Sequence, residues 1–453
     1  MKVPVKNVDF TKGPIVRSII AFSLPIVMGE LLQNLYNSVD ALVVGNLVSR
    51  NALAAVTVSG VISNMVVNFF NGMSVGANVV ISKAFGRGDP EELRRRIRIT
   101  FSFAVMLGVA LSLLGIIFTP QLLQLAGVQA EYYADALKYL RIYLAGLMFT
   151  VIYNNGAGIL RAMGDAHTPF RILIISCCTN ILLDVFFVAA LKLGIVGVAM
   201  ATVCSQALSV TLVYLAISRS QKERCIDFDS LRHGGWQTVR EVLSVGMAAG
   251  MQSALIGFSN IFVVRYMNRF STSAVAGIGI AQRLDRFIVL PAKSFGITMT
   301  TYVSQNLGAE RYERIRSGKW RCLVTSLCVT VSISVMVFLF KEECVALFNS
   351  DPEVVATGVA MMSVLVPMFW IMAVREVYLG VLRGYGHSGV PMVLSLIGMV
   401  AVRQIYLAVM MNRPDPDIRV IYYCYPIAWA ATVILLLVYY LVVRHKMKGI
   451  TVP

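Results

Sequence analysis

Charged residues are scarce in this chain of 453 residues. Asp, Glu, Lys and Arg make up 14% of it, against roughly a quarter in a soluble globular protein. Apolar residues make up 57%, and eight long runs contain no charged residue at all. A soluble domain is therefore excluded. The runs do not alternate in polarity as the strands of a membrane barrel do, so a barrel is excluded as well.

Histidine and pairable cysteine are also scarce. The four histidines and eight cysteines form none of the spacings typical of zinc sites. Only Cys344 is expected near the outer face of a membrane, and a disulfide needs two cysteines in an oxidising compartment. We therefore expect no disulfide, no cofactor and no metal-dependent catalysis, and we predict that the protein is not an enzyme.

The apolar runs have the length of membrane-spanning helices, since about 20 helical residues cross the hydrocarbon core of a bilayer. Together with more sparsely charged runs, they predict an all-α polytopic membrane protein with twelve transmembrane helices. The spans are expected at 18–49, 51–82, 99–130, 142–160, 172–191, 193–218, 242–264, 270–305, 322–340, 354–374, 384–411 and 420–443.

The positive charges follow this alternation. If both termini are cytoplasmic, the segments on the cytoplasmic side of the membrane contain 26 of the 40 Lys and Arg residues. The loops on the external side contain 9. This bias predicts cytoplasmic termini. It also explains basic loops such as Arg94–Arg98, so we expect contact with membrane lipid headgroups and no nucleic-acid partner.

The two halves of the chain repeat each other at a spacing of 222 residues. Gly158–Gly164 aligns with Gly380–Gly386, and Ser82 aligns with Ser304. Self-similarity at half length in an apolar chain is typical of transporters whose substrate site lies between two related bundles. We predict an N-terminal lobe at 1–220, a cytoplasmic linker at 221–235 and a C-terminal lobe at 236–453.

Three acids lie well inside the expected spans of the first half: Glu30, Asp40 and Asp184. An ionised group at this depth is costly and marks an ion or substrate path by default, and no Lys or Arg lies in the same spans to neutralise it. Asn180 shares a helix face with Asp184 by its i, i+4 spacing. Carboxylates with neutral oxygens suit either sodium or a titratable proton.

Further polar side chains are expected near these acids. Gln33 and Tyr36 share a helix stripe with Asp40. Thr202 and Asn154, or its neighbour Asn155, offer additional oxygens, although a lone Asn or Thr in a helix more often bonds to another helix.

The second half carries the opposite charge in its expected spans. Its bases are Arg283, Arg286, Lys293, Arg375 and Arg403, with Asp285 and Glu376 as the acids. Gln282, Arg286 and Lys293 fall on one stripe of an ideal helix, which favours substrates with a carboxylate, sulfonate or phosphate group. The alternative is that these bases reach headgroups or pair with the two acids. Arg375 and Glu376 are adjacent and should point apart, so pairing there should need a neighbouring helix.

Several motifs resemble one transporter family. Pro25 followed by Tyr36-Asn37-Ser38-Val39-Asp40, the segment Ser304–Ala309 and the paired Leu-Arg-x-x-Gly motifs resemble the multidrug and toxic compound extrusion (MATE) family. Asp40 with Asn180 and Asp184 resembles its prokaryotic DinF-like branch. The resemblance implies two six-helix lobes arranged as a V. It also implies a proton or sodium gradient that drives export of small organic compounds from a prokaryotic cell across the plasma membrane.

The resemblance also implies roles for individual residues. The coupling-ion site would comprise Asp40, Asn180, Asp184 and Thr202, which would be the metal ligands if sodium is the ion, with Asn154 nearby. The substrate cavity is predicted from the residues themselves, by their intramembrane charges and shared helix stripes, and takes in Glu30, Gln33, Tyr36, Gln282, Arg283, Arg286 and Lys293. We expect a monomer whose partners are a small organic substrate and membrane lipid.

Two other functions remain open. One is a flippase for a lipid-linked precursor from the same superfamily, which the bases of the second half favour. The other is an intramembrane aspartyl hydrolase that uses Asp40 and Asp184, although the chain lacks the Gly-x-Gly-Asp context of those enzymes.

Overall fold

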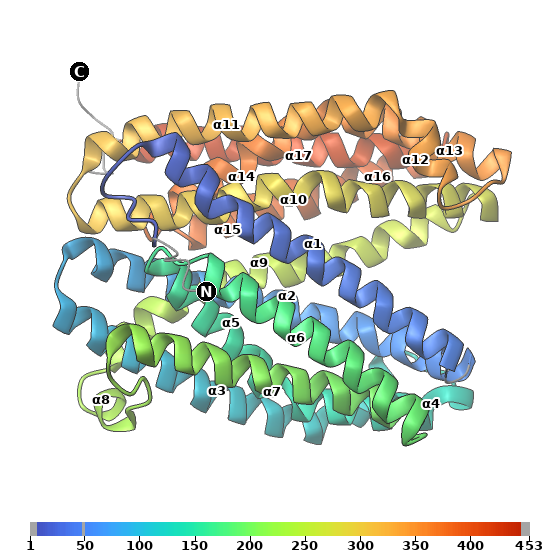
Figure 1. Ribbon diagram of the computed structural model, residues 1–453. Coiled ribbons are helices and arrows are strands. Elements are labelled where there is room, and N and C mark those ends of the chain that lie inside the picture. Colours follow the sequence, from blue (N-terminus) through green and yellow to red (C-terminus); the bar gives the residue numbers. More distant parts are fainter. Residues whose placement is uncertain (1–6, 48–49, 445–453) are drawn as a thin grey trace. The chain divides into compact units, whose positions relative to one another are not determined.

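The computed structural model describes residues 7–47 and 50–444, and of residues 36–47, 50–53, 61 and 64 only the backbone (Figure 1). All regular structure in these residues is helical. The first helices are α1 (Ile15–Leu47), α2 (Arg50–Arg87), α3 (Pro90–Leu125), α4 (Ala130–Ala145), α5 (Leu147–Ala162), α6 (His167–Val185), η1 (Phe186–Ala190), α7 (Gly194–Gln221) and α8 (Phe228–Arg232). They are followed by α9 (Trp236–Met267), α10 (Thr272–Gly308), α11 (Tyr312–Leu339), α12 (Lys341–Ala346), α13 (Pro352–Leu365), η2 (Val366–Met368), α14 (Phe369–Gly384), α15 (Gly389–Leu396), η3 (Ile397–Val402), α16 (Arg403–Met411) and α17 (Arg419–Val443).

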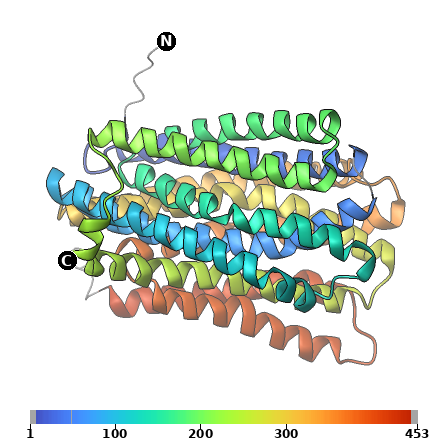
Figure 2. The ribbon, with the colours of Figure 1, turned by 90° about the horizontal axis from the view of Figure 1, so that it is seen from below.

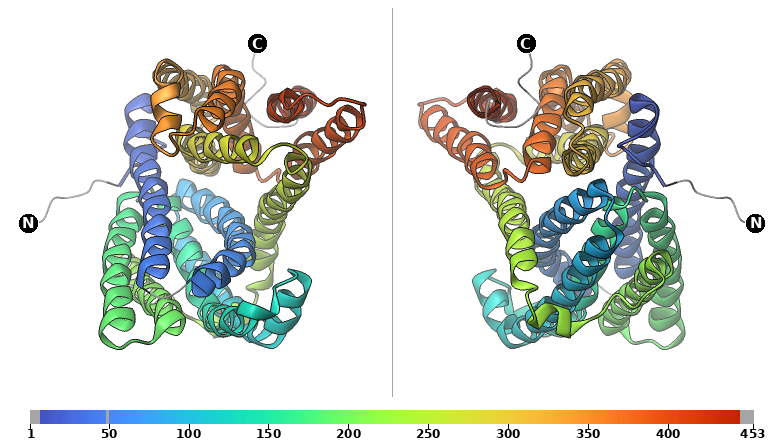
Figure 3. Two further views of the ribbon diagram at one scale, coloured as in Figure 1. Left: turned by 90° about the vertical axis from the view of Figure 1, so that its right-hand side faces the viewer. Right: turned by 90° about the vertical axis from the view of Figure 1, so that its left-hand side faces the viewer.

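The predicted all-α membrane fold is confirmed. Ten helical segments in the described residues are long and apolar enough to span a membrane, and α4 with α5, bent by 42°, makes an eleventh. Helix α10 is the twelfth long helix. It is less apolar because it carries Arg283, Asp285, Arg286 and Lys293. Helix α10 packs against α11, α13 and α14, and in both end-on views it lies beside α11 and α14 (Figure 3).

Two expected boundaries were wrong. The fourth span was expected to begin at residue 142, but α4 begins at Ala130 as an amphipathic helix, and the bend to α5 falls at Gly146. The basic segment Arg94–Arg98 was expected to be a loop between two spans. Asp89 instead caps α3 ahead of it, by accepting hydrogen bonds from the backbone N–H groups of Glu91 and Glu92. The helix then continues without a break to Leu125.

The described residues form two compact units. Unit 1 comprises 7–9 and 28–250, and unit 2 comprises 10–27 and 251–444. These limits differ from the predicted lobes, because α1 and α9 are long helices that each contribute residues to both units. The division of α1 falls between Val27 and Met28, and that of α9 between Gly250 and Met251.

The repeat of 222 residues recurs as identical contacts inside each unit. In unit 1 the Ser82 hydroxyl donates a hydrogen bond to the carbonyl of Ala162 at 3.5 Å. In unit 2 the Ser304 hydroxyl donates to the carbonyl of Gly384 at 3.0 Å, and both partners are shifted by 222.

Equivalent glycines also make equivalent close approaches. A Cβ at Gly158 would lie 2.8 Å from the carbonyl oxygen of Ser74, and one at Gly380 would lie 2.4 Å from that of Gly296. Glycine therefore lets α5 pack closely on α2, and α14 on α10.

The Leu-Arg-x-x-Gly motif ends a helix in each unit. Gly164 and Gly386 have φ of +84° and +88°, values that favour glycine. The backbone N–H of the next residue donates to the leucine carbonyl at 3.0 Å in both copies, from Asp165 to Leu160 and from His387 to Leu382. This is a glycine-dependent helix cap, so the motif has a structural role.

The segment before α1 is anchored in unit 2. Phe10 is fully buried, and its ring packs edge-on against Phe22 and Tyr302. Its backbone N–H donates to Gln305 Oε1 at 3.1 Å, and its carbonyl accepts from Asn306 Nδ2 at 3.1 Å and from an Arg314 guanidinium nitrogen at 3.0 Å. The motif at Ser304–Ala309 therefore receives the chain's own N-terminal segment.

Two small-residue pairs bring α2 and the first part of α9 together in unit 1. Gly72 and Gly76 lie four residues apart on α2, as do Gly246 and Gly250 on α9. A Cβ at Gly76 would lie 2.1 Å from the carbonyl oxygen of Val242, so the two backbones are in direct contact. This is the G-x-x-x-G pattern of membrane helix pairs, a signal that our sequence analysis missed.

Candidate functional site

The candidate ion site in unit 1 begins with a polar stripe on α6. Ser176, Asn180 and Asp184 follow one another at intervals of four residues and are 8%, 1% and 0% exposed. Asp184 lies one residue before the end of α6, where the helix widens into the π-helical turn η1. Such turns are rare and often mark functional positions.

Helix α7 lies against this stripe and places Thr202 beside it. The two helices run side by side (Figures 1 and 2). The Ser176 hydroxyl donates to the Ser205 carbonyl of α7 at 2.9 Å. Because the helices are antiparallel, Thr202 comes to about the level of Asn180. Thr202 is 5% exposed, and its hydroxyl donates to the Val198 carbonyl at 3.1 Å.

Asn154 is not brought to this level. Thr150 of α5 donates to Gln206 of α7 at 2.9 Å. Helices α5 and α7 run in the same direction, so Asn154 lies near residue 210, roughly 12 Å along the axis from Thr202. Its neighbour Asn155 is buried and donates to the Val151 carbonyl, a local contact of its own helix.

Of the four predicted site residues on α1, the structure describes the side chains of only Glu30 and Gln33. The side chains of Tyr36 and Asp40 lie outside the described residues. Gln33 is exposed and Glu30 is half-buried. Arg161, in the last turn of α5, interacts electrostatically with Glu30. The expectation that the acids of the first half have no basic neighbour was therefore wrong for Glu30, because Arg161 had been assigned to a loop.

In unit 2 the residues of the predicted basic stripe on α10 differ in exposure and in partners. Arg283, Arg286 and Lys293 are exposed. Gln282 is half-buried and donates to the Tyr425 hydroxyl at 2.8 Å. Asp285 interacts electrostatically with Lys293 and Arg286, which is the pairing that the sequence left open.

Arg375 and Glu376 form a buried ion pair, at 6% and 8% exposure. Adjacent residues were expected to need a neighbouring helix in order to pair. That expectation was wrong, because the long guanidinium side chain reaches the next carboxylate directly. These two charges neutralise each other and leave Arg403 as a separate buried base, on α16.

Comparison with known families decides what these units are. The MatE family model matches residues 25–186 and 248–409, once in each half. The chain belongs to the MatE family. The predicted family resemblance is thereby confirmed, and the DinF-like branch stays a prediction.

Relatives of this MatE protein match along most of their length. The "Probable multidrug resistance protein YpnP" of Bacillus subtilis is 28% identical, over 87% of this chain and 88% of the relative. The "Probable multidrug resistance protein YoeA" of the same bacterium is 26% identical, over 99% and 98%. A structure described as an "outward-facing conformation of a multidrug resistance MATE family transporter of the MOP superfamily" has a TM-score of 0.88 at 19% identity. The alignment covers 99% of both chains.

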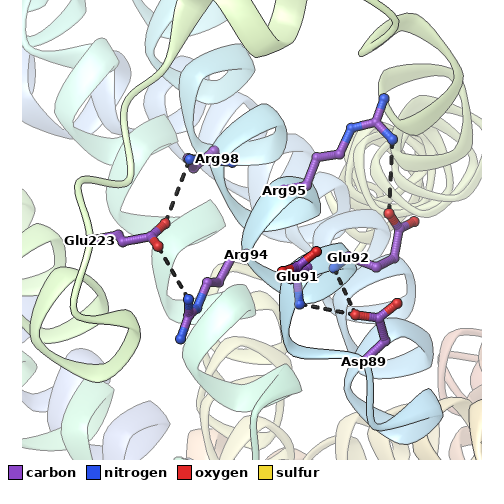
Figure 4. Close-up of a pocket in the computed structure, with 7 residues that line it drawn as sticks. All are labelled: Asp89, Glu91, Glu92, Arg94, Arg95, Arg98 and Glu223. Carbon is purple, nitrogen blue, oxygen red and sulfur yellow. Dashed lines mark hydrogen bonds and ion pairs between the residues drawn. The ribbon is translucent and has the colours of Figure 1, made fainter.

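The linker of the MatE protein is held on α3 by ion pairs. Arg94 and Arg98 contact Glu223 at 3.2 and 3.5 Å, and Arg98 also contacts Asp227 at 3.8 Å. Figure 4 shows both arginines pointing at Glu223 across a pocket of about 490 Å³. The basic cluster that was expected to meet lipid headgroups therefore uses two of its arginines to bind linker carboxylates.

Hydrogen bonds fix the linker further. Asp227 accepts from the backbone N–H groups of Asp229 and Ser230 and from the Ser230 hydroxyl, and these bonds lower the pKa of its carboxyl. Arg96 extends the network to α9 by contacting Glu241 at 2.8 Å.

We predict that Cys225 in the linker reacts slowly with maleimides. It is 1% exposed, and burial raises the pKa of its thiol although the Ser218 hydroxyl acts in the opposite direction. Because the thiolate is the reactive form, alkylation at pH 7.5 should be about tenfold slower than at an exposed site. The measurement compares a variant whose only cysteine is Cys225 with a reference that lacks all eight native cysteines and carries Ser220→Cys at an exposed position.

The same assay tests the ionic attachment of the linker. Adding Arg94→Gln and Arg98→Gln should speed alkylation of Cys225 several-fold and leave the Ser220→Cys reference unchanged. An unchanged rate of alkylation at Cys225 would show that the ion pairs do not hold the linker against α3.

Proposed function

We propose that this MatE protein is a secondary active antiporter that exports small amphipathic organic compounds in exchange for protons or sodium ions. It would work by alternating access in the plasma membrane of a prokaryote, with both termini in the cytoplasm. The observation that carries the proposal is the buried polar group of unit 1, formed by Asn180, Asp184 and Thr202.

The chemistry of this group suits a coupling ion. A carboxylate removed from solvent inside a membrane protein is stabilised by a bound cation or by a proton. Asn180 and Thr202 supply neutral oxygens of the kind that complete a hard-cation site. Occupancy of such a site can change the relative stability of two conformations, which is what coupling requires. The names of YpnP and YoeA support organic compounds as the cargo.

A lipid-linked precursor flippase is the second candidate. The observation that favours it is a buried base of unit 2, Arg403, since such precursors carry phosphate. An intramembrane hydrolase gains no support from membership in a family of transporters.

Transport by purified protein in proteoliposomes tests the proposal. Vesicles containing a fluorescent amphipathic dye receive a sodium gradient or a proton gradient, each imposed alone. We expect dye movement with one of the two gradients, abolished by the matching ionophore. Equal dye movement without any gradient would contradict antiport. Movement of a labelled phospholipid but not of the dye would favour the flippase.

A further inference from the structure

Arg403 is a buried cation without an acidic partner in the part of the chain that the structure describes. It is 2% exposed and is among the largest fully buried side chains of the described residues. Its Nη2 donates to the Ser259 hydroxyl at 2.7 Å, and its guanidinium lies 5.8 Å from the centre of the Tyr425 ring. Its Nε has no hydrogen-bond partner, and the titratable groups of the described residues that act on it, Tyr425 and Cys424, include no carboxylate.

The contacts of Arg403 do not explain why a charge is kept there. Burying a guanidinium without a counter-charge is unfavourable, and one hydroxyl with one distant ring offsets this only in part. Ser259 does not need Arg403, because its hydroxyl also accepts from Gln404 Nε2 at 3.0 Å. An apolar side chain at 403 would therefore leave no polar partner stranded, and stability alone gives no reason for arginine.

Arg403 and Asp184 lie in corresponding helices of the two repeats. Each lies next to a π-helical turn in the fifth span of its repeat, Asp184 just before η1 and Arg403 just after η3. The repeat aligns Asp184 with Tyr406, less than one helical turn from Arg403. The two halves thus place buried charges of opposite sign at nearly equivalent positions.

The surroundings of Arg403 are both aromatic and polar. Tyr425 presents an aromatic face, and its hydroxyl is fixed by Gln282 of α10. Asp285, one turn further along α10, acts electrostatically on Tyr425, but it also has Arg286 and Lys293 as basic neighbours of its own.

We propose that Arg403 binds the oxyanion of a transported compound, a carboxylate, sulfonate or phosphate. Nε and Nη2 lie on one edge of the guanidinium, which can engage two oxygens at once. The anion would take the partnerless Nε and share Nη2 with Ser259. The proposal rests on the proposed function in one respect only, that the ligand is also the cargo.

Binding measured without any gradient tests the site independently of antiport. The probes are 2-naphthoate and 2-naphthamide, which share one ring system and differ in charge, titrated calorimetrically into protein in phosphatidylcholine nanodiscs. Wild-type protein should prefer the carboxylate at least about tenfold. Arg403→Met should remove this preference while the melting temperature stays the same or rises. Arg403→Lys, which keeps the charge but loses the bidentate edge, should reduce it several-fold.

Lys319→Met is the matched control. Lys319 is a buried cation of the same unit, 7% exposed, with its ammonium on the Tyr440 hydroxyl at 2.7 Å. The Lys319→Met variant should keep the wild-type preference for 2-naphthoate over 2-naphthamide. An unchanged carboxylate preference in both Arg403 variants would overturn the proposal, as would an equal loss in Lys319→Met. A further titration in nanodiscs with added phosphatidylglycerol identifies the source of the oxyanion. If the added lipid weakens naphthoate binding to the wild type but not to Arg403→Met, lipid phosphate competes for the same site.

Discussion

Asp184→Asn is expected to lower the rate of gradient-driven export about 10- to 100-fold, while the protein still inserts and folds. Asp184 is fully buried beside Asn180, and an amide of the same shape preserves packing. The amide can neither release a proton nor supply the negative charge that holds a cation. The measurement is the initial rate of dye export in proteoliposomes under the gradient that drives the wild type.

Ser176→Ala provides the control on the same stripe. It removes the hydrogen bond to the Ser205 carbonyl, which is worth about 0.5–1.5 kcal/mol, but it leaves Asp184 in place. Export by this variant should stay driven by the gradient. If Asp184→Asn exported at the wild-type rate, the carboxylate would not be part of the coupling site.

Gly76→Ala is expected to destabilise unit 1 by about 1–3 kcal/mol, the usual cost of adding atoms to a packed interior. Its new Cβ would meet the Val242 carbonyl oxygen at 2.1 Å and the Gly246 nitrogen at 2.8 Å. Both are backbone atoms of α9, which cannot move aside as a flexible side chain can. The measurement is the protein that remains monodisperse after heating in detergent.

Gly60→Ala is the matched comparison on the same helix. A Cβ at Gly60 meets nothing within 4 Å, so the exchange should be neutral or stabilise the helix by up to about 1 kcal/mol. Equal stability of the two variants would mean that α2 and α9 are not in tight contact at Gly76.

The sequence predicted the helical class and the repeat because both depend on features that are local or that recur. Apolar runs of helix length predict spans whatever surrounds them. The repeat is visible in the structure as equivalent hydrogen bonds, from the Ser82 hydroxyl to the Ala162 carbonyl and from the Ser304 hydroxyl to the Gly384 carbonyl. Prediction failed at α4, whose charged residues made it read as a loop. Helix α10 is charged as well, but its span was predicted at 270–305 and it runs from Thr272 to Gly308.

The candidate site was predictable only within one helix. The i, i+4 spacing placed Asn180 and Asp184 on one face, and both are buried. Which residues of other helices lie at that level depends on packing, so Asn154 was assigned to a group from which it is distant. The π-helical turns beside Asp184 and Arg403 leave no clear sequence signal, because a π turn needs only one extra residue in the helix.

The anchoring of Phe10 in unit 2 sets an order of events during synthesis. Its hydrogen-bond partner Gln305 follows 295 residues later. At about 5–20 residues per second, the ribosome reaches Gln305 roughly 15–60 s after Phe10. During that interval Phe10 can pack on Phe22 but not on Tyr302. The first segment made is therefore among the last to find its native partners, and the core of unit 2 closes only after most of the chain has been translated.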